Sequence, residues 1–283
     1  SYDPGAPEMK IGINTLFYIP GEVGGSETYL LEILRKWKTG PFHHEIVLFT
    51  QKENHQGLFD EFSGAGWSFV CCPFKARNRV VRIVREQLEL PWKVKKTEVD
   101  VLWSPGYTAP LLGFCPQVVS ILDMQYKSFP QDLSFVGRWT TEILVQLACR
   151  KAKKILTISQ FSKKEILKFT RARPDQVEVT LLAASADFIP DEVAEVEKAS
   201  PPTLLCVANT YPHKNVDQLV RAFVRLEDEI AHDLVIIGKP RLGEAEYMAA
   251  VRSLKNPDRL IRKQGLSRDQ LVEEYFKTDL FVF

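Results

Sequence analysis

Residues 201–226 read PPTLLCVANTYPHKNVDQLVRAFVRL, and this stretch decides the fold. Its apolar run at 203–208 is typical of a buried strand in a parallel sheet. A polar turn follows at 209–213, and from Val216 onward the apolar residues recur at the i, i+3, i+4 and i+7 spacing of a helix that packs on a sheet. We expect Asn215 to cap this helix, with Gln218 as its capping-box partner. The stretch therefore predicts a strand, a tight turn and a helix N-terminus.

Lys214 lies at the exit of this turn, immediately before the predicted helix. The N-terminus of a helix that follows a parallel strand is a favourable place for an anion, and a lysine beside it adds a positive point charge. Lys214 is therefore a candidate for binding a phosphate group. An ordinary strand-to-helix turn with a solvated lysine would show the same residues, and this stretch alone leaves both interpretations open.

A comparable turn lies near the start of the chain. Residues 10–14 (KIGIN) predict a strand, residues 14–25 (NTLFYIPGEVGG) a glycine-rich loop, and Ser26 is expected to cap the helix that follows. The glycines lack the G-x-G-x-x-G spacing of a dinucleotide-binding turn. Gly24 and Gly25 nevertheless stand directly before a helix N-terminus, where flexible backbone lets N–H groups approach a phosphate. A plain strand-to-helix turn is the alternative.

The rest of the chain alternates between strand and helix patterns. Apolar runs predict further strands at 45–50, 67–71, 99–104, 117–122, 154–158 and 177–182, with helices at 80–94, 139–150 and 162–169. After residue 203 the alternation continues with strands at 203–208, 233–238, 258–263 and 279–283, and with a helix capped by Ser267 and Gln270. This alternation predicts an α/β fold of parallel sheets that helices cover on both faces.

Residues 187–202 are acidic, poor in large apolar residues and bracketed by prolines, which is typical of a linker. We predict two Rossmann-like, doubly wound domains at 1–187 and 203–283, joined by a linker at 188–202. Because ligands of such sheets bind outside the carboxyl ends of the strands, the two turns are expected to face one cleft. The second domain would end on a buried strand, so we expect it to be incomplete in this chain.

The composition excludes several classes of function. The net charge of +1, from 37 basic and 36 acidic residues, argues against a general nucleic-acid binder. The 5 cysteines form no C-x-x-C pair and are expected to be buried, reduced thiols of a cytoplasmic protein. The 5 histidines have no metal-ligand spacing to carboxylates or cysteines, so no metal is expected. No stretch has the length of a membrane span or the apolar core of a signal peptide.

Eight segments carry a resemblance to a known family. They are PGEVGGSETYLLEIL (20–34), REQLELPWKV (85–94), DVLWSPGYTAPL (100–111), VVSILDMQYKSFP (118–130), KILTISQFSKKEI (154–166), VANTYPHKNVDQLVRAF (207–223), LVIIGKP (234–240) and KQGLSRDQLVEEYFKTDLFVF (263–283). In this order they resemble the retaining glycosyltransferases of glycosyltransferase family 4, two-domain GT-B enzymes that use nucleotide-diphosphate sugars. Within the family, the sequence is most similar to bacterial mannosyltransferases that build surface polysaccharide.

The resemblance implies transfer of a hexose, mannose or glucose, from a nucleotide-diphosphate sugar to a hydroxyl group of a glycan or lipid-linked acceptor. It implies retention at the anomeric carbon without a metal or other cofactor. It assigns the first domain to the acceptor side and the second to the nucleotide sugar. The donor-binding residues that it implies are Gly24 and Gly25 behind the diphosphate, Lys214 and His213 at the leaving phosphate, and Gly238, Gly265 and Leu266 at the nucleoside.

The sequence departs from the family pattern at several positions. Leu122 and Trp103 stand where the family often has histidine, and Asn209 stands where more distant members have arginine. The E-x-x-x-x-x-x-x-E motif, whose glutamates hold the donor sugar in the family, would follow a segment like DLFVF and is therefore expected beyond Phe283. The resemblance thus implies that the chain as given is inactive. A non-catalytic protein of the same fold that binds a nucleotide, a sugar or a partner is the alternative.

Two further features concern the acceptor side. Asp123 follows the predicted strand at 117–122, where it could bind a sugar or acceptor hydroxyl or, alternatively, only stabilise the turn. Residues 77–96, from Arg77 to Lys96, carry seven basic side chains against two acidic ones, with apolar residues between them. This pattern suits contact with a membrane surface, possible for a cytoplasmic enzyme with a lipid-linked acceptor. A solvated helix face packed on the sheet is the alternative.

Overall fold

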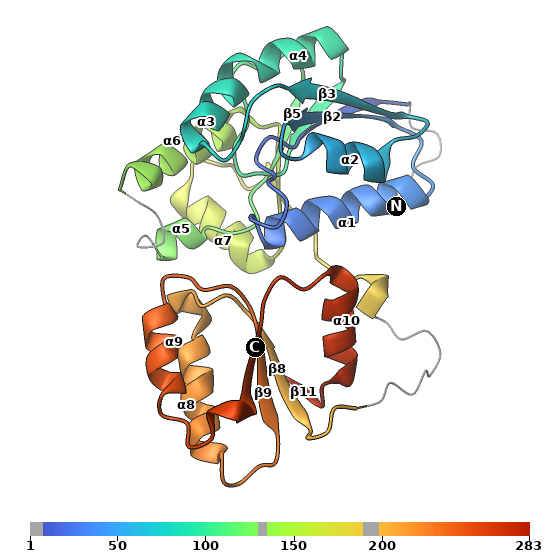
Figure 1. The fold of residues 1–283 in the computed structure, drawn as a ribbon. Coiled ribbons are helices and arrows are strands. Elements are labelled where there is room, and N and C mark those ends of the chain that lie inside the picture. The colour runs from blue at the N-terminus through green and yellow to red at the C-terminus, as the bar shows by residue number, and fades with distance from the viewer. Residues whose placement is uncertain (1–7, 130–134, 189–197) are drawn as a thin grey trace. The chain divides into compact units, whose positions relative to one another are not determined.

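The computed structural model describes residues 8–129, 135–188 and 198–283, and most of the predicted linker, residues 189–197, lies outside them. The chain divides into two compact units, Ser1–Ala183 (unit 1) and Ala184–Phe283 (unit 2). Each unit has its own parallel sheet and its own hydrophobic core (Figure 1). The predicted α/β fold with doubly wound parallel sheets is confirmed.

Unit 1 contains a sheet of 7 strands in the order β3-β2-β1-β4-β5-β6-β7, and every neighbouring pair is parallel. The strands are β1 (Lys10–Asn14), β2 (Glu45–Gln51), β3 (Trp67–Cys72), β4 (Val101–Ser104), β5 (Gln117–Ser120), β6 (Lys154–Thr157) and β7 (Val177–Val179). The order runs outward from β1 in one direction and from β4 in the other. The switch point of a doubly wound sheet therefore lies between β1 and β4.

Helices cover both faces of this sheet. They are α1 (Gly25–Thr39), α2 (His55–Phe62), α3 (Arg79–Leu88), α4 (Leu90–Thr97), α5 (Gln125–Ser128), α6 (Phe135–Lys151) and α7 (Gln160–Phe169). Leu30 and Leu34 of α1 pack with Ile13 of β1, whereas Leu90 of α4 packs with Phe49 of β2 in a separate cluster. The single helix predicted at 80–94 is two helices, because Pro91 lies in the first turn of α4 and cannot continue a preceding helix.

Unit 2 contains a sheet of 4 parallel strands in the order β10-β9-β8-β11. The strands are β8 (Thr203–Val207), β9 (Asp233–Ile237), β10 (Leu260–Lys263) and β11 (Leu280–Phe281), and the helices are α8 (Val216–Leu226), α9 (Glu244–Val251) and α10 (Arg268–Lys277). Three 3-10 turns complete the unit, η2 (Ala186–Phe188), η3 (Pro212–Lys214) and η4 (Pro257–Arg259). Helices α8 and α9 pack on one face and α10 on the other. The switch point of this sheet lies between β8 and β11.

The predicted helix caps have different outcomes. Ser267 and Gln270 form the predicted capping box at the start of α10. Asn215 occupies the predicted N-cap position of α8, but the predicted capping box with Gln218 is absent, because the backbone of Asn215 is left-handed (φ 51°, ψ 31°) and its side chain makes no capping hydrogen bond. The prediction for Ser26 is wrong, because the N-cap position of α1 lies two residues earlier, at Gly24. In both places the residue before the helix has a positive φ, left-handed at Asn215 and, at Gly24, combined with a ψ of −129° that favours glycine.

Candidate functional site at the carboxyl ends of the strands

A buried polar network lies at the switch point of unit 1. Asn14 at the end of β1 donates from Nδ2 to Glu86 Oε1 of α3 at 2.7 Å and to Ser104 Oγ at the end of β4 at 3.3 Å. Thr108 donates from its hydroxyl group to both carboxylate oxygens of Glu86, at 3.1 and 2.9 Å. Burial raises the pKa of Glu86, and the hydrogen bonds from Asn14 and Thr108 oppose that rise. This network fixes α3 over the carboxyl ends of β1 and β4.

The loop after β4 brings a tyrosine into the same region. A Cβ atom on Gly106 would lie 2.5 Å from the Phe17 ring, so only glycine allows this approach. Tyr107 follows with a φ of 68°, a conformation that is strained for a bulky side chain and is concentrated at functional sites. Its side chain lies close to those of Asp123 and Ser26. Burial, followed by the nearby charge of Asp123, raises the pKa of Tyr107 well above its usual value.

Asp123 lies after β5 and faces a pocket of about 320 Å³. One carboxylate oxygen accepts the backbone N–H of Gln125 at 3.0 Å, so the turn-stabilising role that we considered for Asp123 is present. The same carboxylate also contacts Tyr107. Its use in binding an acceptor stays a prediction.

Gly24 and Gly25 are exposed at the N-terminus of α1. A Cβ atom on either residue would meet nothing within 4 Å, so open space lies beside both. Gly24 has a φ of +60°, which favours glycine. Since Ser26 in the first turn of α1 contacts Tyr107, this helix N-terminus lies close to Asp123. Unit 1 therefore brings the predicted glycines and the predicted aspartate together.

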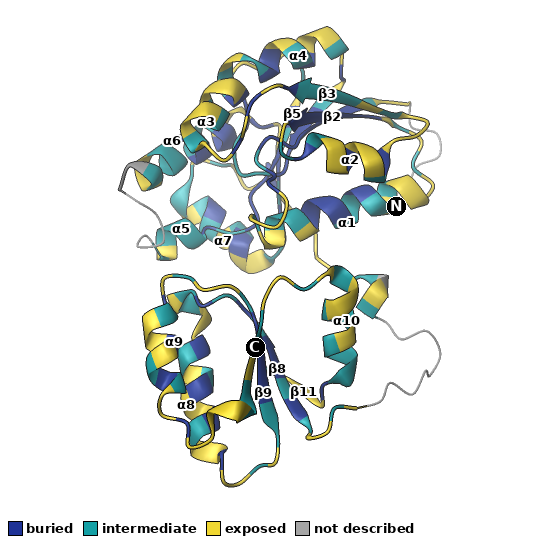
Figure 2. Cartoon of the chain, in the orientation of Figure 1, coloured by how far each residue is buried: buried dark blue, intermediate teal, exposed yellow. Residues whose placement is uncertain are grey.

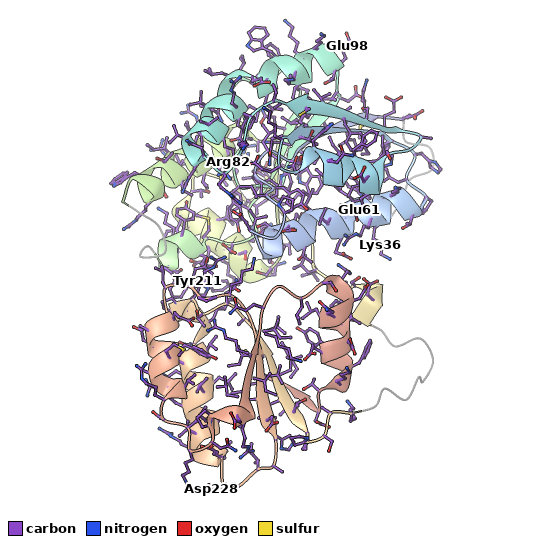
Figure 3. The ribbon with its side chains drawn as sticks, in the orientation of Figure 1. Lys36, Glu61, Arg82, Glu98, Tyr211 and Asp228 are labelled. Carbon is purple, nitrogen blue, oxygen red and sulfur yellow. The ribbon has the colours of Figure 1, made fainter. Side chains whose placement is uncertain are left out.

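In unit 2, Lys214 lies at the switch point between β8 and β11. It ends the 3-10 turn η3, is exposed, and places its ammonium group 4.8 Å from the centre of the Phe283 ring, just after β11. His213 stacks on Tyr211, with ring centres 5.5 Å apart and planes 20° apart. Tyr211, labelled in Figure 3, lies at the end of unit 2 opposite Asp228. The lysine thus stands at the predicted edge, and that it shares a cleft with Gly24 and Gly25 stays a prediction.

The residues predicted to contact the nucleoside, Gly238, Gly265 and Leu266, each have a local structural role. A Cβ atom on Gly238 would lie 2.0 Å from the Ala208 carbonyl oxygen, so the loops after β8 and β9 approach too closely for any other residue. Gly265 adopts a φ of +67° beside open space. Leu266 packs against Leu205 and Val235 under α10. A role of these residues in nucleoside binding stays a prediction.

Our sequence reasoning missed one charged cluster in unit 2. Arg262 of β10 forms an ion pair with Glu244 at the start of α9, and Thr210 donates to the same carboxylate at 2.7 Å. The hydrogen bond from Arg262 lowers the pKa of Glu244. Arg262 Nε also donates to the carbonyl oxygen of Gly238 at 3.4 Å. No short motif marks this cluster, because pairing of β9 with β10 brings together residues that are far apart in the sequence.

The residues that depart from the family pattern have defined places. Trp103 is buried, donates from Nε1 to Ser120 Oγ at 2.8 Å and lies edge-on to Tyr29. Leu122 is buried in the same cluster. Asn209 accepts the backbone N–H of Lys239 at 2.8 Å and so joins the loops after β8 and β9. Trp103 and Leu122 are thus core residues.

All five cysteines are free, and Cys72, Cys149 and Cys206 are buried as predicted, whereas Cys71 and Cys115 are half-buried. Burial raises the pKa of Cys72 to about 12 and that of Cys149 to about 11. Among the described residues, no three His, Cys, Asp or Glu side chains lie close enough together to hold a metal ion. Within the same residues no helix combines the length and apolar character needed to cross a bilayer.

Comparison with known proteins agrees with this architecture. The family model of Glycosyltransferase Family 4 matches residues 23–182, and that of Glycosyl transferases group 1 matches residues 188–283. The chain therefore belongs to Glycosyltransferase Family 4. None of the curated proteins compared with it matches.

Three solved structures share the fold at low sequence identity. HepE of Anabaena in complex with UDP and glucose has a TM-score of 0.66 and 16% identity, over 97% of this chain and 73% of that one. The sucrose-phosphate synthase of Thermosynechococcus elongatus has a TM-score of 0.68 and 10% identity, over 97% and 75% of the two chains. A glycosyltransferase of Rickettsia africae has a TM-score of 0.61 and 14% identity, over 98% and 73%. These neighbours establish the GT-B glycosyltransferase fold.

Proposed function

We propose that this protein transfers a hexose from a nucleotide-diphosphate sugar to a hydroxyl group of a glycan or lipid-linked acceptor. The observation that carries the proposal is the pair of switch points in a chain of Glycosyltransferase Family 4, each with a candidate anion-binding group. One is Lys214 beside η3, and the other is the N-terminus of α1 at Gly24 and Gly25. The UDP and glucose bound to HepE of Anabaena support a nucleotide sugar as the donor.

In the proposed reaction, the bond from the anomeric carbon to the diphosphate oxygen breaks while the bond to the acceptor oxygen forms on the same face of the sugar. The departing phosphate oxygen takes the hydroxyl proton, and attack on the face that the phosphate leaves retains the configuration. Lys214 stabilises the negative charge on the leaving diphosphate, and the N–H groups at the start of α1 add the favourable field of a helix N-terminus. The proposed role of the protein is to position the reactants and offset charge, without a metal.

Binding of nucleotide sugars tests the donor part of the proposal. UDP-, GDP- and ADP-sugars are titrated into the wild-type chain and into Lys214→Ala and Lys255→Ala. Lys255 is a matched control, because it is exposed and pairs with Asp228 at the opposite end of unit 2 (Figure 3). We expect Lys214→Ala to weaken binding of one donor at least tenfold and Lys255→Ala to leave it unchanged.

If Lys214→Ala lowers the melting temperature as well as the affinity for the nucleotide sugar, the lysine is structural. Binding of none of the donors would refute the donor assignment. Where an acceptor is found, the anomeric configuration of the product, read by NMR, tests retention. Binding without either hydrolysis or transfer by the complete protein would favour the non-catalytic alternative.

We further propose that the outer face of α3 and α4 contacts an anionic membrane surface on the cytoplasmic side. Val80, Val84, Leu88 and Trp92 define this outer face; Val80 and Leu88 are 70% and 67% exposed. The only buried residue of α3 is Glu86, and most of this helix is exposed or intermediate (Figure 2), with Val80, Val81, Val84 and Leu88 among its exposed residues. A solvated helix face packed on the sheet is the alternative, and the vesicle experiment below distinguishes the two.

The charge around the outer face complements an anionic lipid surface. Apart from Arg79 and Arg82, which line the pocket that Asp123 faces, residues 77–96 hold five basic and two acidic residues, although the whole chain has a net charge of only +1. Lys95 places its ammonium group over the rings of Trp92 and Phe114, at 5.6 and 4.9 Å from their centres. Aromatic rings beside basic groups are typical of segments that lie in a membrane interface.

Vesicle sedimentation tests the membrane part separately. We expect the protein to bind vesicles that contain phosphatidylglycerol, to release them as the salt concentration rises, and to ignore vesicles of phosphatidylcholine alone. Leu88→Ser should reduce binding at least fivefold, whereas Leu226→Ser, at an exposed position of unit 2, should not. Absence of binding at low salt, or equal loss in both variants, would exclude the outer face as a membrane contact.

A further inference from the structure

The pocket that Asp123 faces lies behind α3, on the opposite side of this helix from the outer face. Its volume is about 320 Å³, and α3, α6 and the loops after β4 and β5 contribute its walls. The polar side chains used below are Arg79, Arg82, Tyr107, Thr108, Asp123 and Thr141. Arg82 is labelled in Figure 3.

Arg82 has no acidic partner among the described residues. In the described part of the chain, no carboxylate lies within ion-pair distance of Arg82, and no side-chain hydrogen bond is formed by it. Glu86, one turn further along α3, supplies an opposing charge, but its oxygens already accept hydrogen bonds from Asn14 and Thr108. Burial lowers the pKa of Arg82, as expected for a guanidinium group partly removed from water.

The hydrogen-bond donors of Arg79 are also incompletely paired. Arg79, three residues before Arg82, donates from Nη2 to the carbonyl oxygen of Gly137 at 3.2 Å and to the hydroxyl group of Thr141. Its Nε atom is buried without a hydrogen-bond partner among the described residues. Both of its acceptors are neutral. Two guanidinium groups on adjacent turns of one helix, both short of an anion, are unfavourable unless a bound anion offsets them.

We propose that this pocket binds the phosphate group of a phosphorylated acceptor, an inference that rests on the proposed transferase function. Two guanidinium groups supply two positive charges and several N–H donors, which matches the roughly −1.5 to −2 charge and three oxygens of a phosphate monoester. A single carboxylate would leave one arginine uncompensated.

Asp123 makes one end of the pocket negative, whereas the arginines make the other end positive. Its negative charge repels a phosphate from the carboxyl end of β5 and favours a hydroxyl group there, and Tyr107 holds this carboxylate in place. An acceptor with phosphate at one end and hydroxyl groups at the other fits this polarity. The ligand class is therefore a phosphorylated sugar or polyol, either free or as the headgroup of a lipid.

NMR of methyl-labelled protein tests the phosphate site directly. Ile83 and Leu144 line the pocket, so their methyl signals should shift saturably as inorganic phosphate replaces chloride at constant ionic strength. Arg82→Gln should weaken phosphate binding at least tenfold, and so should Arg79→Gln. Arg85→Gln is the matched control, because Arg85 is exposed on the same helix and pairs with Glu89 at 3.0 Å. The control should bind phosphate as the wild type does.

Further ligands identify the source of the phosphate. Tighter binding of glucose 6-phosphate than of inorganic phosphate, with this gain lost in Asp123→Asn, would support a free sugar phosphate. Shifts at Ile83 and Leu144 caused only by vesicles that contain phosphatidylinositol would support a lipid headgroup. No saturable shift with any phosphate ligand, or equal weakening in the Arg82 and Arg85 variants, would overturn the proposal.

The same methyl-labelled samples distinguish failure of the phosphate site from failure of the proposed transferase function. Ile236 and Ile237 of β9 report on unit 2, where the nucleotide sugar is proposed to bind. Phosphate shifts at Ile83 with no response of unit 2 to any nucleotide sugar would leave the phosphate site standing while the transferase function fails. Nucleotide-sugar shifts in unit 2 without phosphate shifts at Ile83 and Leu144 would refute the phosphate site alone.

Discussion

Substitution of Gly238 by alanine should unfold unit 2 selectively. The added Cβ atom would lie 2.0 Å from the carbonyl oxygen of Ala208 and 2.9 Å from the backbone nitrogen of Asn209. Both contacts are to backbone, so no side chain can move aside to relieve them. The loops that follow β8 and β9 must separate by more than about 1 Å before the methyl group fits.

The cost follows from what this separation breaks. The hydrogen bond from Lys239 N to Asn209 Oδ1 (2.8 Å) and that from Ala208 N to Ile237 O (3.0 Å) join the two segments. Two lost hydrogen bonds cost about 1 kcal/mol each, and overpacking adds about 1–3 kcal/mol. We therefore expect the free energy of unfolding of unit 2 to fall by about 3–5 kcal/mol, a large part of the stability of a typical domain.

The distribution of tryptophan provides the assay. All 5 tryptophans belong to unit 1, so their fluorescence reports the unfolding of unit 1 only. Far-ultraviolet circular dichroism reports both units. In urea titrations, Gly238→Ala should shift part of the dichroism transition to lower urea and leave the fluorescence transition in place. Gly25→Ala, where the added Cβ meets nothing within 4 Å, is the control and should shift neither signal to lower urea.

An unchanged dichroism transition in Gly238→Ala would show that the strand ends relax without cost, and the packing argument would fail. A fluorescence transition that moves together with the dichroism transition would show that the two units do not unfold separately.

Three further substitutions test other contacts. Ser267→Ala removes the capping box of α10 and should destabilise unit 2 by about 0.5–2 kcal/mol in the same dichroism assay; no change would mean that the cap contributes nothing. Because burial raises the pKa of Glu86, its contribution to the stability of unit 1 falls as the pH rises above about 4.5, and Glu86→Gln should remove this slope from the fluorescence transition. Because Arg262 lowers the pKa of Glu244, the stability that this pair gives unit 2 is lost as the pH falls below about 4.5, and Glu244→Gln should abolish this acid-side loss; a persistent loss would contradict the pairing.

The strands and their parallel arrangement could be predicted because strands buried on both faces leave uninterrupted apolar runs. β1 follows the run KIGIN residue by residue, and β8 follows the predicted run at 203–208 except for its last residue. The cap of α8 could not be predicted, because residue type does not determine the backbone angles of Asn215. The 3-10 turn η3 takes up the residues before it and leaves Asn215 in a left-handed conformation.

The orientation of α3 could not be predicted from the sequence either. Its apolar and basic residues both recur at helical spacing, so periodicity alone does not say which face points inward. Contacts of Glu86 with Asn14, 72 residues earlier, and with Thr108, 22 residues later, settle the question. The pocket behind α3 follows from this orientation, and no local sequence motif predicts it. The places of Lys214, Gly24 and Gly25 in the turns after parallel strands could be predicted, because such turns leave a local sequence signal.

The strand order of unit 2 has a consequence for synthesis of the chain on the ribosome. β8 lies between β9 and β11, and it pairs with β11 through Leu204–Leu280 and Leu205–Phe281. Helices α8, α9 and α10 and strands β9 and β10 are all translated before β11 emerges. Until then, one edge of the apolar strand TLLCV has unpaired backbone groups, and such edges promote aggregation. Nascent chains that stall between residues 263 and 280 should therefore depend most strongly on chaperones.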